Sequence, residues 1–348
     1  MEKWEERVIG EFCELVQVDS LSGKERLMAD LLKRKLQEMG LEVWEDQAGA
    51  AVHGNAGNVL ARLPGNGGPG PAMLICAHMD TVEPGCGVQP QLTDGVIRSA
   101  GDTVLGADDK AGVVTILEVL RWVLERDIKH GGLEAAFTIW EENGLKGAKN
   151  LDTSTLNATV GYVLDSTGQP GGIVINAPSH DQITARITGK AAHAGICPEA
   201  GVSAIQIAAH AVAGMELGRI DDETTCNIGT ISGGKATNIV PDLVVLEGEA
   251  RSLNPEKKQL RTELMCRTIE DTAARFNGKA EIIVETAYHG YKLKDTDLPV
   301  RIAMEAAQKL GLACSLNKTG GGSDANVFNK KGIPTAVLGI GMKQVHTT

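Results

Sequence analysis

Apolar runs that end in His, Asp or Glu constrain the fold of this chain more than any other feature. Such runs cover residues 73–77, 135–140, 162–164 and 334–341. Their length and composition predict strands. The polar side chains at or shortly after their ends are His78 and Asp80, Glu141 and Glu142, Asp165, and His346. Open α/β sheets bind ligands at the carboxyl edge of their strands, so we expect these groups to converge if the strands are parallel neighbours.

Helices alternate with these strands in the first half of the chain. Apolar residues recur at helical spacing in residues 4–16, which predicts a docking helix. Ser22 and Glu25 have the spacing of a capping box that opens a helix ending at Gly40. The remaining predicted elements are strands at 41–46, 58–64 and 72–78, a helix at 110–126, and strands at 133–142 and 162–165. This order predicts an α/β domain with a mixed sheet and helices on both faces.

The pattern changes between residues 178 and 291. Strands are predicted at 181–189, 226–231, 242–250 and 281–286, with helices at 202–217 and 255–275. This β-α-β-β-α-β order is typical of a ferredoxin-like α+β domain. From residue 292 the α/β pattern returns, with a helix at 300–311 and the strand at 334–341. We therefore predict a catalytic metal-binding domain of residues 1–177 and 292–348, and an inserted lid or dimerisation domain of residues 178–291.

Composition excludes several classes of partner. The net charge of -11 disfavours binding to nucleic acid or to anionic membranes, and the aromatic share of 3% leaves few rings to stack on bases. No apolar stretch is long enough to span a bilayer, and the N-terminus carries acidic residues where a signal peptide would be apolar. The seven cysteines include no CxxC pair, which indicates a reducing compartment. We expect a cytoplasmic protein that acts on small molecules or short peptides.

The candidate site residues also have ordinary explanations when each is taken alone. His78 and Asp80 form an HxD motif that commonly lies in a surface turn, although Asp80 could orient the His78 ring at a metal. Asp108 lies at the start of a predicted helix, where acidic side chains act as caps. Glu141 and Glu142 are harder to explain, because neighbouring strand residues face opposite ways. Both can reach one site only where the chain leaves the sheet, and there one can bind a metal while the other moves a proton.

The motifs AHMD, GADDKAG, EENG, LDS and VHTT, in this order, resemble those of a dizinc metallopeptidase family. That family contains peptidase T, carboxypeptidase G and aminoacylase. The resemblance spans nearly the whole chain. It is strongest to peptidase T-like tripeptidases, through the motifs GADDKAG, GKAAHAG, KATNIVP and GGGSDAN. The absence of paired cysteines near these motifs also disfavours a structural thiolate zinc site.

The resemblance implies a ligand set for two divalent metal ions, zinc in the first place, with cobalt or manganese as alternatives. One ion would be held by His78, Asp108 and Asp165, and the other by Asp108, Glu142 and His346, with Asp108 bridging them. Glu141 would be the general base, and Asp80 would orient the His78 imidazole without binding a metal ion itself. A cis peptide bond is implied between Asp108 and Asp109. In this family the chain continues into a C-terminal helix after the last ligand, whereas here Thr348 is the final residue.

The same resemblance assigns roles to residues of the inserted domain. His193 would stabilise the oxyanion in the active site of a dimer partner, and Asn238 and Arg251 would hold substrate. Arg251, which directly follows the strand predicted at 242–250, could equally pair with Glu247 or Glu249. Outside that domain, Gly321 belongs to a glycine run that lacks the lysine of a phosphate-binding loop, so a loop lining the peptide pocket is expected instead.

These observations predict a metal-dependent peptidase that cleaves short peptides and forms a homodimer through the inserted domain. A deacylase or carboxypeptidase of the same family, acting on N-acyl amino acids or on C-terminal residues, is the alternative within enzymes, because the metal motif does not separate these activities. A non-catalytic binding module that keeps the fold is a further alternative. Glu141 argues against it, since a binding protein needs no proton acceptor beside a metal ion.

Overall fold

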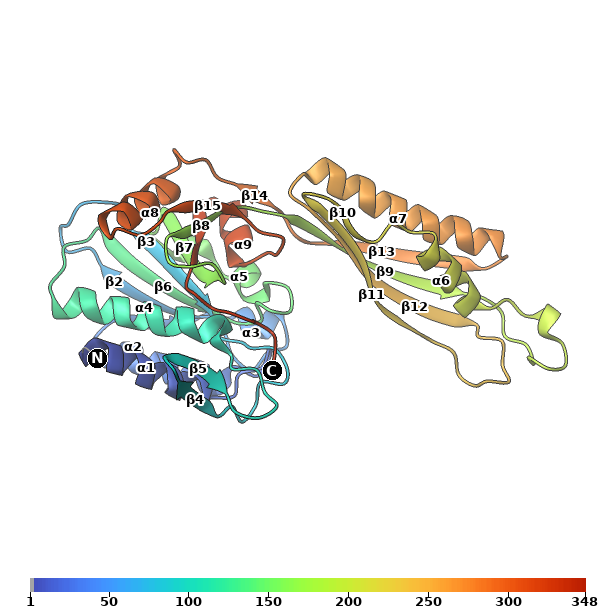
Figure 1. Ribbon diagram of the computed structural model, residues 1–348, viewed down its shortest axis with the longest axis horizontal. Coiled ribbons are helices and arrows are strands. Elements are labelled where there is room, and N and C mark those ends of the chain that lie inside the picture. The colour runs from blue at the N-terminus through green and yellow to red at the C-terminus, as the bar shows by residue number, and fades with distance from the viewer. Residues whose placement is uncertain (1–2) are drawn as a thin grey trace. The chain divides into compact units, whose positions relative to one another are not determined.

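A computed structural model describes residues 3–348, which form two compact units. Unit 1 consists of the chain up to Ile175, Lys292–Lys318 and Ser323–Thr348. Unit 2 consists of Asn176–Tyr291 and Thr319–Gly322. The elements of both are labelled in Figure 1. Among the described residues, no helix is both long and apolar enough to cross a bilayer.

Unit 1 is built on a mixed nine-stranded sheet. Its order is β1-β2-β6-β3-β7-β16-β8-β14, and β15 pairs with β8. The strands are β1 (Glu42–Glu45), β2 (Val59–Pro64), β3 (Met73–His78), β6 (Gly132–Thr138), β7 (Val160–Ser166), β8 (Gly172–Ala177), β14 (Tyr291–Lys292), β15 (Ser315–Lys318) and β16 (Thr335–Gly339). The neighbours β6, β3, β7 and β16 are parallel, so their carboxyl ends meet at one edge, as the sequence predicted.

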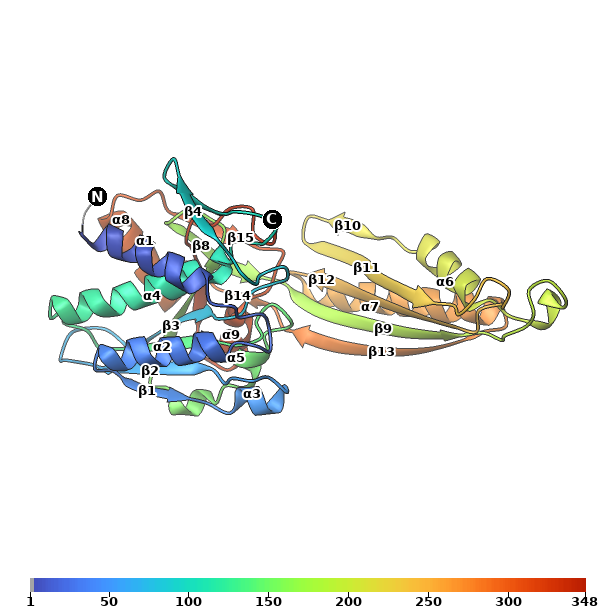
Figure 2. The same cartoon turned by 90° about the horizontal axis from the view of Figure 1, so that it is seen from below.

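Helices cover both faces of this sheet, which confirms the predicted fold class. On one face α4 (Ala107–Glu125) packs on β3 and β7, and α2 (Arg26–Glu38) packs on β1 and β2. The N-terminal helix α1 (Lys3–Val16) packs against α4 (Figures 1 and 2). On the other face α8 (Leu298–Lys309) and α9 (Asp324–Lys330) pack on β7 and β16. The short helices α3 (Ala48–Ala51) and α5 (Lys146–Asn150) and the hairpin β4 (Pro90–Thr93) and β5 (Val96–Ser99) complete unit 1.

Unit 2 has the predicted β-α-β-β-α-β order with one additional short strand. Its antiparallel sheet has the order β10-β11-β12-β9-β13. The elements are β9 (Ser179–Thr188), α6 (Ala204–Ala213), β10 (Gly218–Asp221), β11 (Thr224–Gly233), β12 (Leu243–Ser252), α7 (Pro255–Arg275) and β13 (Lys279–Tyr288). Alternate strand residues such as Ile187 and Leu246 share one core with Ile207 of α6 and Ile269 of α7. Both helices therefore cover the same face of the sheet.

The predicted capping box before α2 is wrong. Glu25 occupies the N-cap position and makes no side-chain cap hydrogen bond. The Ser22 hydroxyl instead donates to Oδ2 of Asp80 at 2.6 Å, and Oε1 of Glu25 accepts from the backbone N–H groups of Gly23 and Trp140. The bonds of Ser22 with Asp80 and of Trp140 with Glu25 are long-range, and they take the place of the capping box that the spacing suggested.

Candidate metal centre

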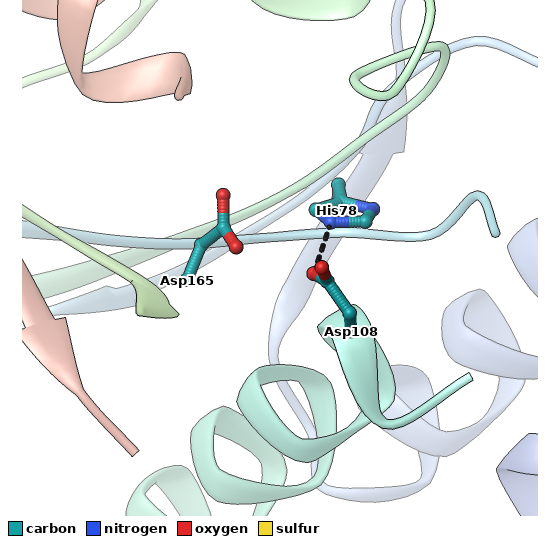
Figure 3. A group of neighbouring side chains, drawn as sticks. All are labelled: His78, Asp108 and Asp165. Atoms are coloured by element: carbon teal, nitrogen blue, oxygen red, sulfur yellow. Dashed lines mark hydrogen bonds and ion pairs between the residues drawn. The ribbon is translucent and has the colours of Figure 1, made fainter. Parts of the chain in front are cut away.

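The carboxyl edge of the parallel strands brings the predicted metal ligands of unit 1 together. His78 is the last residue of β3, Asp165 lies in β7, and Asp108 lies in the first turn of α4. Each offers one ligand atom, and these atoms lie within 4.8 Å of one another. Figure 3 shows the three side chains converging, with a hydrogen bond between His78 and Asp108. His78 is buried, and the two carboxylates are partly exposed.

A second group of possible ligands shares Asp108 with the first. It contains Asp108, Glu142 and His346, again with ligand atoms within 4.8 Å of one another. Nε2 of His346 lies 3.0 Å from Oε1 of Glu142 and 3.3 Å from Oδ2 of Asp108. Nε2 of His78 lies 3.0 Å from Oδ1 of Asp108. The two oxygens of Asp108 therefore face different imidazoles, an arrangement suited to a carboxylate that bridges two cations.

The backbone at the start of α4 turns the Asp108 side chain toward the centre. Gly106 has a left-handed φ of 73°, and Asp108 and Asp109 have non-helical backbone angles. The peptide bond between Asp108 and Asp109 is cis, as the resemblance implied. Asp109 belongs to neither ligand group. Its Oδ1 accepts the N–H of Gly112 at 3.1 Å and its Oδ2 accepts the N–H of His78 at 3.3 Å, so it links α4 to the end of β3.

A tight turn after β6 directs the Glu141 and Glu142 carboxylates. The strand ends at Thr138, two residues earlier than the apolar run, and Trp140 adopts a left-handed φ of 52°. Asp80 holds the next residues, since its Oδ1 accepts the N–H of Glu141 at 2.9 Å and its Oδ2 accepts the N–H of Glu142 at 3.2 Å. The two acids therefore lie where the chain leaves the sheet, which the alternation of strand residues required.

Asp80 is also close to His78. Nδ1 of His78 lies 2.9 Å from the backbone carbonyl oxygen of Asp80 and 3.5 Å from its carboxylate Oδ1. The carbonyl is thus the nearer partner of the ring, while the carboxylate mainly binds the Glu141 and Glu142 backbone and the Ser22 hydroxyl. Either contact orients the imidazole so that Nε2 points toward Asp108.

The centre concentrates negative charge in a buried place. Burial, reinforced by neighbouring carboxylates, raises the pKa of Glu141 and of Asp165 well above their usual range. Burial likewise raises the pKa of Glu142. Hydrogen bonding to Asp108 raises the pKa of His346 to about 9. Cations would relieve the repulsion among the buried carboxylates. The mixed carboxylate and imidazole donors suit zinc or a similar divalent ion.

The remaining predicted site residues lie in unit 2. The His193 ring is exposed, and its Nδ1 accepts the N–H groups of Gly195 and Ile196 at 3.2 Å each, so a neutral ring carries its proton on Nε2. Asn238 is exposed, and its backbone carbonyl oxygen accepts the N–H of Ala194 at 2.9 Å. This bond joins the loop of Asn238 to the loop of His193. The N–H of Gly321 donates to the Thr319 hydroxyl at 3.1 Å.

Arg251 forms an ion pair within unit 2. Its partner is Glu249, one of the two glutamates that the sequence offered as alternatives. Its Nε and Nη2 atoms donate to the two carboxylate oxygens of Glu249 at 2.9 Å each. His180, opposite Arg251 in the sheet, lies 3.4 Å from Oε2 of Glu249. Hydrogen bonding to His180 and to Arg251 lowers the pKa of Glu249 to about 2. The pairing fixes the direction of the guanidinium and leaves Nη1 without a partner in the ion pair.

Sequence reasoning did not single out several residues that support the centre. Asp324, the first residue of α9, is buried and accepts hydrogen bonds at Oδ2 from the Thr138 hydroxyl at 2.5 Å and the Cys76 thiol at 3.7 Å. Burial raises the pKa of Asp324 to about 6. Lys110 is 1% exposed and donates to the Ser20 hydroxyl and the Met79 carbonyl. Each lies inside a motif that carried the resemblance, GGGSDAN or GADDKAG, and that was the only available signal.

Comparisons with known proteins agree with this geometry. Residues 179–275 match the family model described as a peptidase dimerisation domain, and residues 58–196 match that of peptidase family M28. The crystal structure of aminopeptidase PepT from Bacillus cereus is 47% identical, with a TM-score of 0.87, over 99% of this chain and 92% of that one. A tripeptidase from Staphylococcus aureus is 44% identical, with a TM-score of 0.92 and the same coverage.

A more distant structure shares the fold. The YXEP protein of Bacillus subtilis, described as a dinuclear metal-binding peptidase of the M20 family, is 21% identical, with a TM-score of 0.71, over 99% of this chain and 91% of that one. The identity to the first two structures extends over nearly the whole length of each chain. This chain therefore belongs to the peptidase T-like metallopeptidases of the M20 family.

Proposed function

We propose that the protein removes the N-terminal residue from short peptides, tripeptides in the first place, with two divalent metal ions and a glutamate general base. The observation that carries this proposal is the shared position of Asp108 in two adjoining ligand groups, with Glu141 beside them and in neither group. The names of the two similar structures, an aminopeptidase PepT and a tripeptidase, support the choice of substrate.

The donor set fits the proposed metal ions. His78, Asp108 and Asp165 would hold one ion, and Asp108, Glu142 and His346 would hold the other, with zinc as the first choice and cobalt or manganese as alternatives. When bound, the ions polarise the scissile carbonyl and lower the pKa of a water molecule. The dinuclear metal site in the description of the M20 peptidase from Bacillus subtilis supports the count of two.

Glu141 would move the proton. Its side chain is 8% exposed, and its raised pKa shows that the surroundings disfavour the charged form when no cation is bound. Beside bound cations the carboxylate would ionise and accept a proton from the attacking water. The same carboxyl group would then deliver that proton to the nitrogen of the leaving amine. Asp80 accepts the N–H of Glu141 and so fixes the backbone of that residue. The Glu141 carboxylate would then keep its direction during both transfers.

Unit 2 would provide the dimer interface and the groups that bind the substrate. The match to a peptidase dimerisation domain supports this role for residues 178–291. The exposed His193, with a proton on Nε2, could donate a hydrogen bond to the oxyanion in the active site of the partner. Arg251 would bind a substrate carboxylate through its Nη1, and Asn238 and Gly321 would contact the peptide.

Product analysis tests the proposed function directly. The metal-loaded protein is incubated with dipeptides, tripeptides, tetrapeptides with free or acetylated N-termini, and N-acyl amino acids. We expect release of the first residue from tripeptides and little reaction with acetylated peptides. Preferential release of an acyl group, or of the C-terminal residue, would assign the protein to the deacylase or carboxypeptidase alternative. No cleavage of any compound by protein that retains two metal equivalents would refute the peptidase assignment.

A cytoplasmic location is part of the same proposal. All seven cysteines are free thiols, and two of them, Cys86 and Cys314, are exposed. Exposed thiols persist in a reducing compartment and oxidise outside it. Fractionation of cells that produce the protein, with thiol labelling of each fraction, tests the location.

A further inference from the structure

The segment Ser20–Glu25 contacts the backbone that carries the candidate site. The Ser20 hydroxyl donates to the Met79 carbonyl at 2.8 Å, and the Thr81 N–H donates to the Ser20 carbonyl at 3.0 Å. The Ser22 hydroxyl donates to Oδ2 of Asp80 at 2.6 Å. This segment precedes α2 and contains no predicted ligand, yet it touches the residues that follow β3 on each side of Asp80.

The first four residues of the turn after β6 donate their N–H groups to side-chain oxygens. The N–H of Ile139 donates to Oδ1 of Asn58 at 3.1 Å, and the N–H of Trp140 donates to Oε1 of Glu25 at 3.1 Å. The next two N–H groups donate to the Asp80 carboxylate at 2.9 and 3.2 Å. Backbone N–H groups at the end of a strand need partners when they are buried, and here none of the four partners is a backbone carbonyl.

Glu25 is buried in this turn at a cost in free energy. Its side chain is 0% exposed, and Oε1 accepts both the Gly23 N–H at 2.8 Å and the Trp140 N–H at 3.1 Å. Oε2 is buried and has no hydrogen-bond partner among the described residues. A buried carboxylate oxygen without a partner costs free energy, which the two hydrogen bonds accepted by Oε1 offset in part.

The Trp140 ring is fixed by close packing. A Cβ atom at Gly23 would lie 2.4 Å from Cζ2 of Trp140, and a Cβ atom at Gly54 would lie 2.9 Å from its Nε1. The Lys146 ammonium lies 3.8 Å from the centre of the ring. The left-handed φ of Trp140 is uncommon for a bulky residue, and the Glu25 acceptor and these contacts maintain it. The direction of the following residues, Glu141 and Glu142, depends on this angle.

We propose that Glu25 is a positioning residue of the active site, which holds the N–H of the left-handed Trp140 and thereby aims the carboxylates of Glu141 and Glu142. The proposal rests on the roles proposed above for these two acids. Glu25 acts as a hydrogen-bond acceptor, and its charge is not required. Loss of the acceptor lets the turn relax toward an ordinary backbone conformation, which moves the base and one metal ligand together.

Two substitutions separate the acceptor from the charge. Glu25→Gln keeps an Oε1 acceptor for both N–H groups and places its NH2 group where the unpartnered oxygen lay, so we expect kcat within about threefold of the parent. Glu25→Ala removes the acceptor, and we expect kcat to fall by about tenfold to a hundredfold with KM nearly unchanged. Equilibrium dialysis with zinc should show that Glu25→Ala binds the second metal equivalent more weakly, whereas Glu25→Gln retains it.

Glu134 supplies the matched control. It is 2% exposed, lies in β6 and also accepts backbone N–H groups, those of Asn157 at 2.8 Å and Ala158 at 2.9 Å. Glu134→Ala should lower the melting temperature and leave kcat and the metal equivalents of the folded protein unchanged. If Glu134→Ala reduces kcat and metal binding as strongly as Glu25→Ala, Glu25 has only a structural role and the proposal is wrong. Equal losses in Glu25→Ala and Glu25→Gln would also overturn it, because the charge would then matter.

A second route keeps the proposal testable if Glu25→Ala does not fold. Gly23→Ala leaves Glu25 in place but forces a methyl group against the Trp140 ring, and we expect the same loss of kcat and of the second metal equivalent. Parent-like behaviour of Gly23→Ala would contradict the proposal. Glu141→Gln distinguishes this result from failure of the proposed function. An inactive Glu141→Gln beside a fully active Glu25→Ala sinks only the Glu25 proposal, whereas an active Glu141→Gln sinks the assignment of the base itself.

Discussion

Oδ1 of Asp80 accepts the backbone N–H of Glu141 at 2.9 Å, so a residue after β3 fixes the residue that we propose as the general base after β6. The other oxygen of the same carboxylate accepts the N–H of Glu142 at 3.2 Å. The parallel pairing of β3 and β6 brings these ends together. The backbone of Glu141 is therefore held by contacts that do not involve its own side chain, which makes a change at that side chain a clean test.

Glu141→Gln should keep the fold and both metal equivalents and lose most of the activity. The substitution preserves the shape of the side chain and the Asp80 contact, which uses the backbone, but removes the proton acceptor. We expect kcat to fall by about 10²-fold to 10⁴-fold. Metal analysis and steady-state kinetics on one preparation measure both quantities. Glu142→Gln is the control, because it changes a proposed ligand and should reduce the metal content. A Glu141→Gln protein that turns over near the parent rate would show that another group moves the proton.

The unfolding free energy of the metal-free protein should depend on pH through Glu25. Burial, with a smaller contribution from the Asp80 charge, raises the pKa of Glu25 from 4.5 to about 7. Between these values the unfolded chain releases the proton and the folded chain keeps it. The stability associated with Glu25 is therefore fully present below pH 4.5 and is lost as the pH rises through 7.

Glu25→Gln removes this dependence, because an amide does not titrate. Between pH 4.5 and pH 8 the parent should lose free energy of unfolding through Glu25, and the variant should not. The difference between the two proteins should therefore change in favour of the variant by a few kcal/mol at most. Urea denaturation of both metal-free proteins at the two pH values measures the double difference, from which all other titrating groups cancel. A difference that does not change with pH would mean that Glu25 ionises as readily in the folded state as in the unfolded one.

Gly112→Ala should destabilise unit 1 and weaken metal binding. A Cβ atom at Gly112 would lie 2.6 Å from the Leu164 carbonyl oxygen and 2.4 Å from Oδ1 of Asp109. The carbonyl belongs to β7 and cannot move without shifting Asp165, the next residue. We expect a loss of about 1–3 kcal/mol in the free energy of unfolding.

Gly10→Ala is the opposite control, because a Cβ atom there meets nothing within 4 Å and Gly10 is an exposed residue of α1. It should gain about 0.5–1 kcal/mol. Equal melting temperatures of the two variants would refute the packing argument.

The sequence predicted those parts of the molecule that depend on periodic burial. The runs that became β3, β6, β7 and β16 are apolar because both faces of their sheet are covered, so they were visible without a structure. The convergence of His78, Asp165 and their neighbours followed from the rule on parallel strand ends. Asp108 did not follow from that rule, since it lies at the start of a helix, and only the family resemblance grouped it with the others.

Two kinds of element escaped prediction for different reasons. The edge strand β15, Ser315–Lys318, has mostly exposed side chains, so it shows no apolar alternation. The hairpin of β4 and β5 did carry a signal, because Asp94 and Gly95 both have positive φ and Asp-Gly is the usual pair for such a turn. The contact between Glu25 and Trp140 spans 115 positions in sequence and had no local signal; the local pattern pointed to a capping box instead.

Mixed dimers should test whether His193 serves the active site of the partner. Glu141→Ala lacks the proposed base in its own site and still offers an intact His193, whereas His193→Ala keeps its metals and base and offers no oxyanion donor. If the two groups act in different subunits, a mixed dimer contains one complete site and one site that lacks both groups. Mixing the two variants under conditions that exchange subunits should therefore restore activity well above that of either variant alone. Mixing each variant with itself under the same conditions controls for the effect of subunit exchange. His193→Gln, which retains a donor of different reach, shows how strictly the geometry is set. A mixture that stays as inactive as its components, although exchange is demonstrated by differently sized tags, would place His193 outside the neighbouring site.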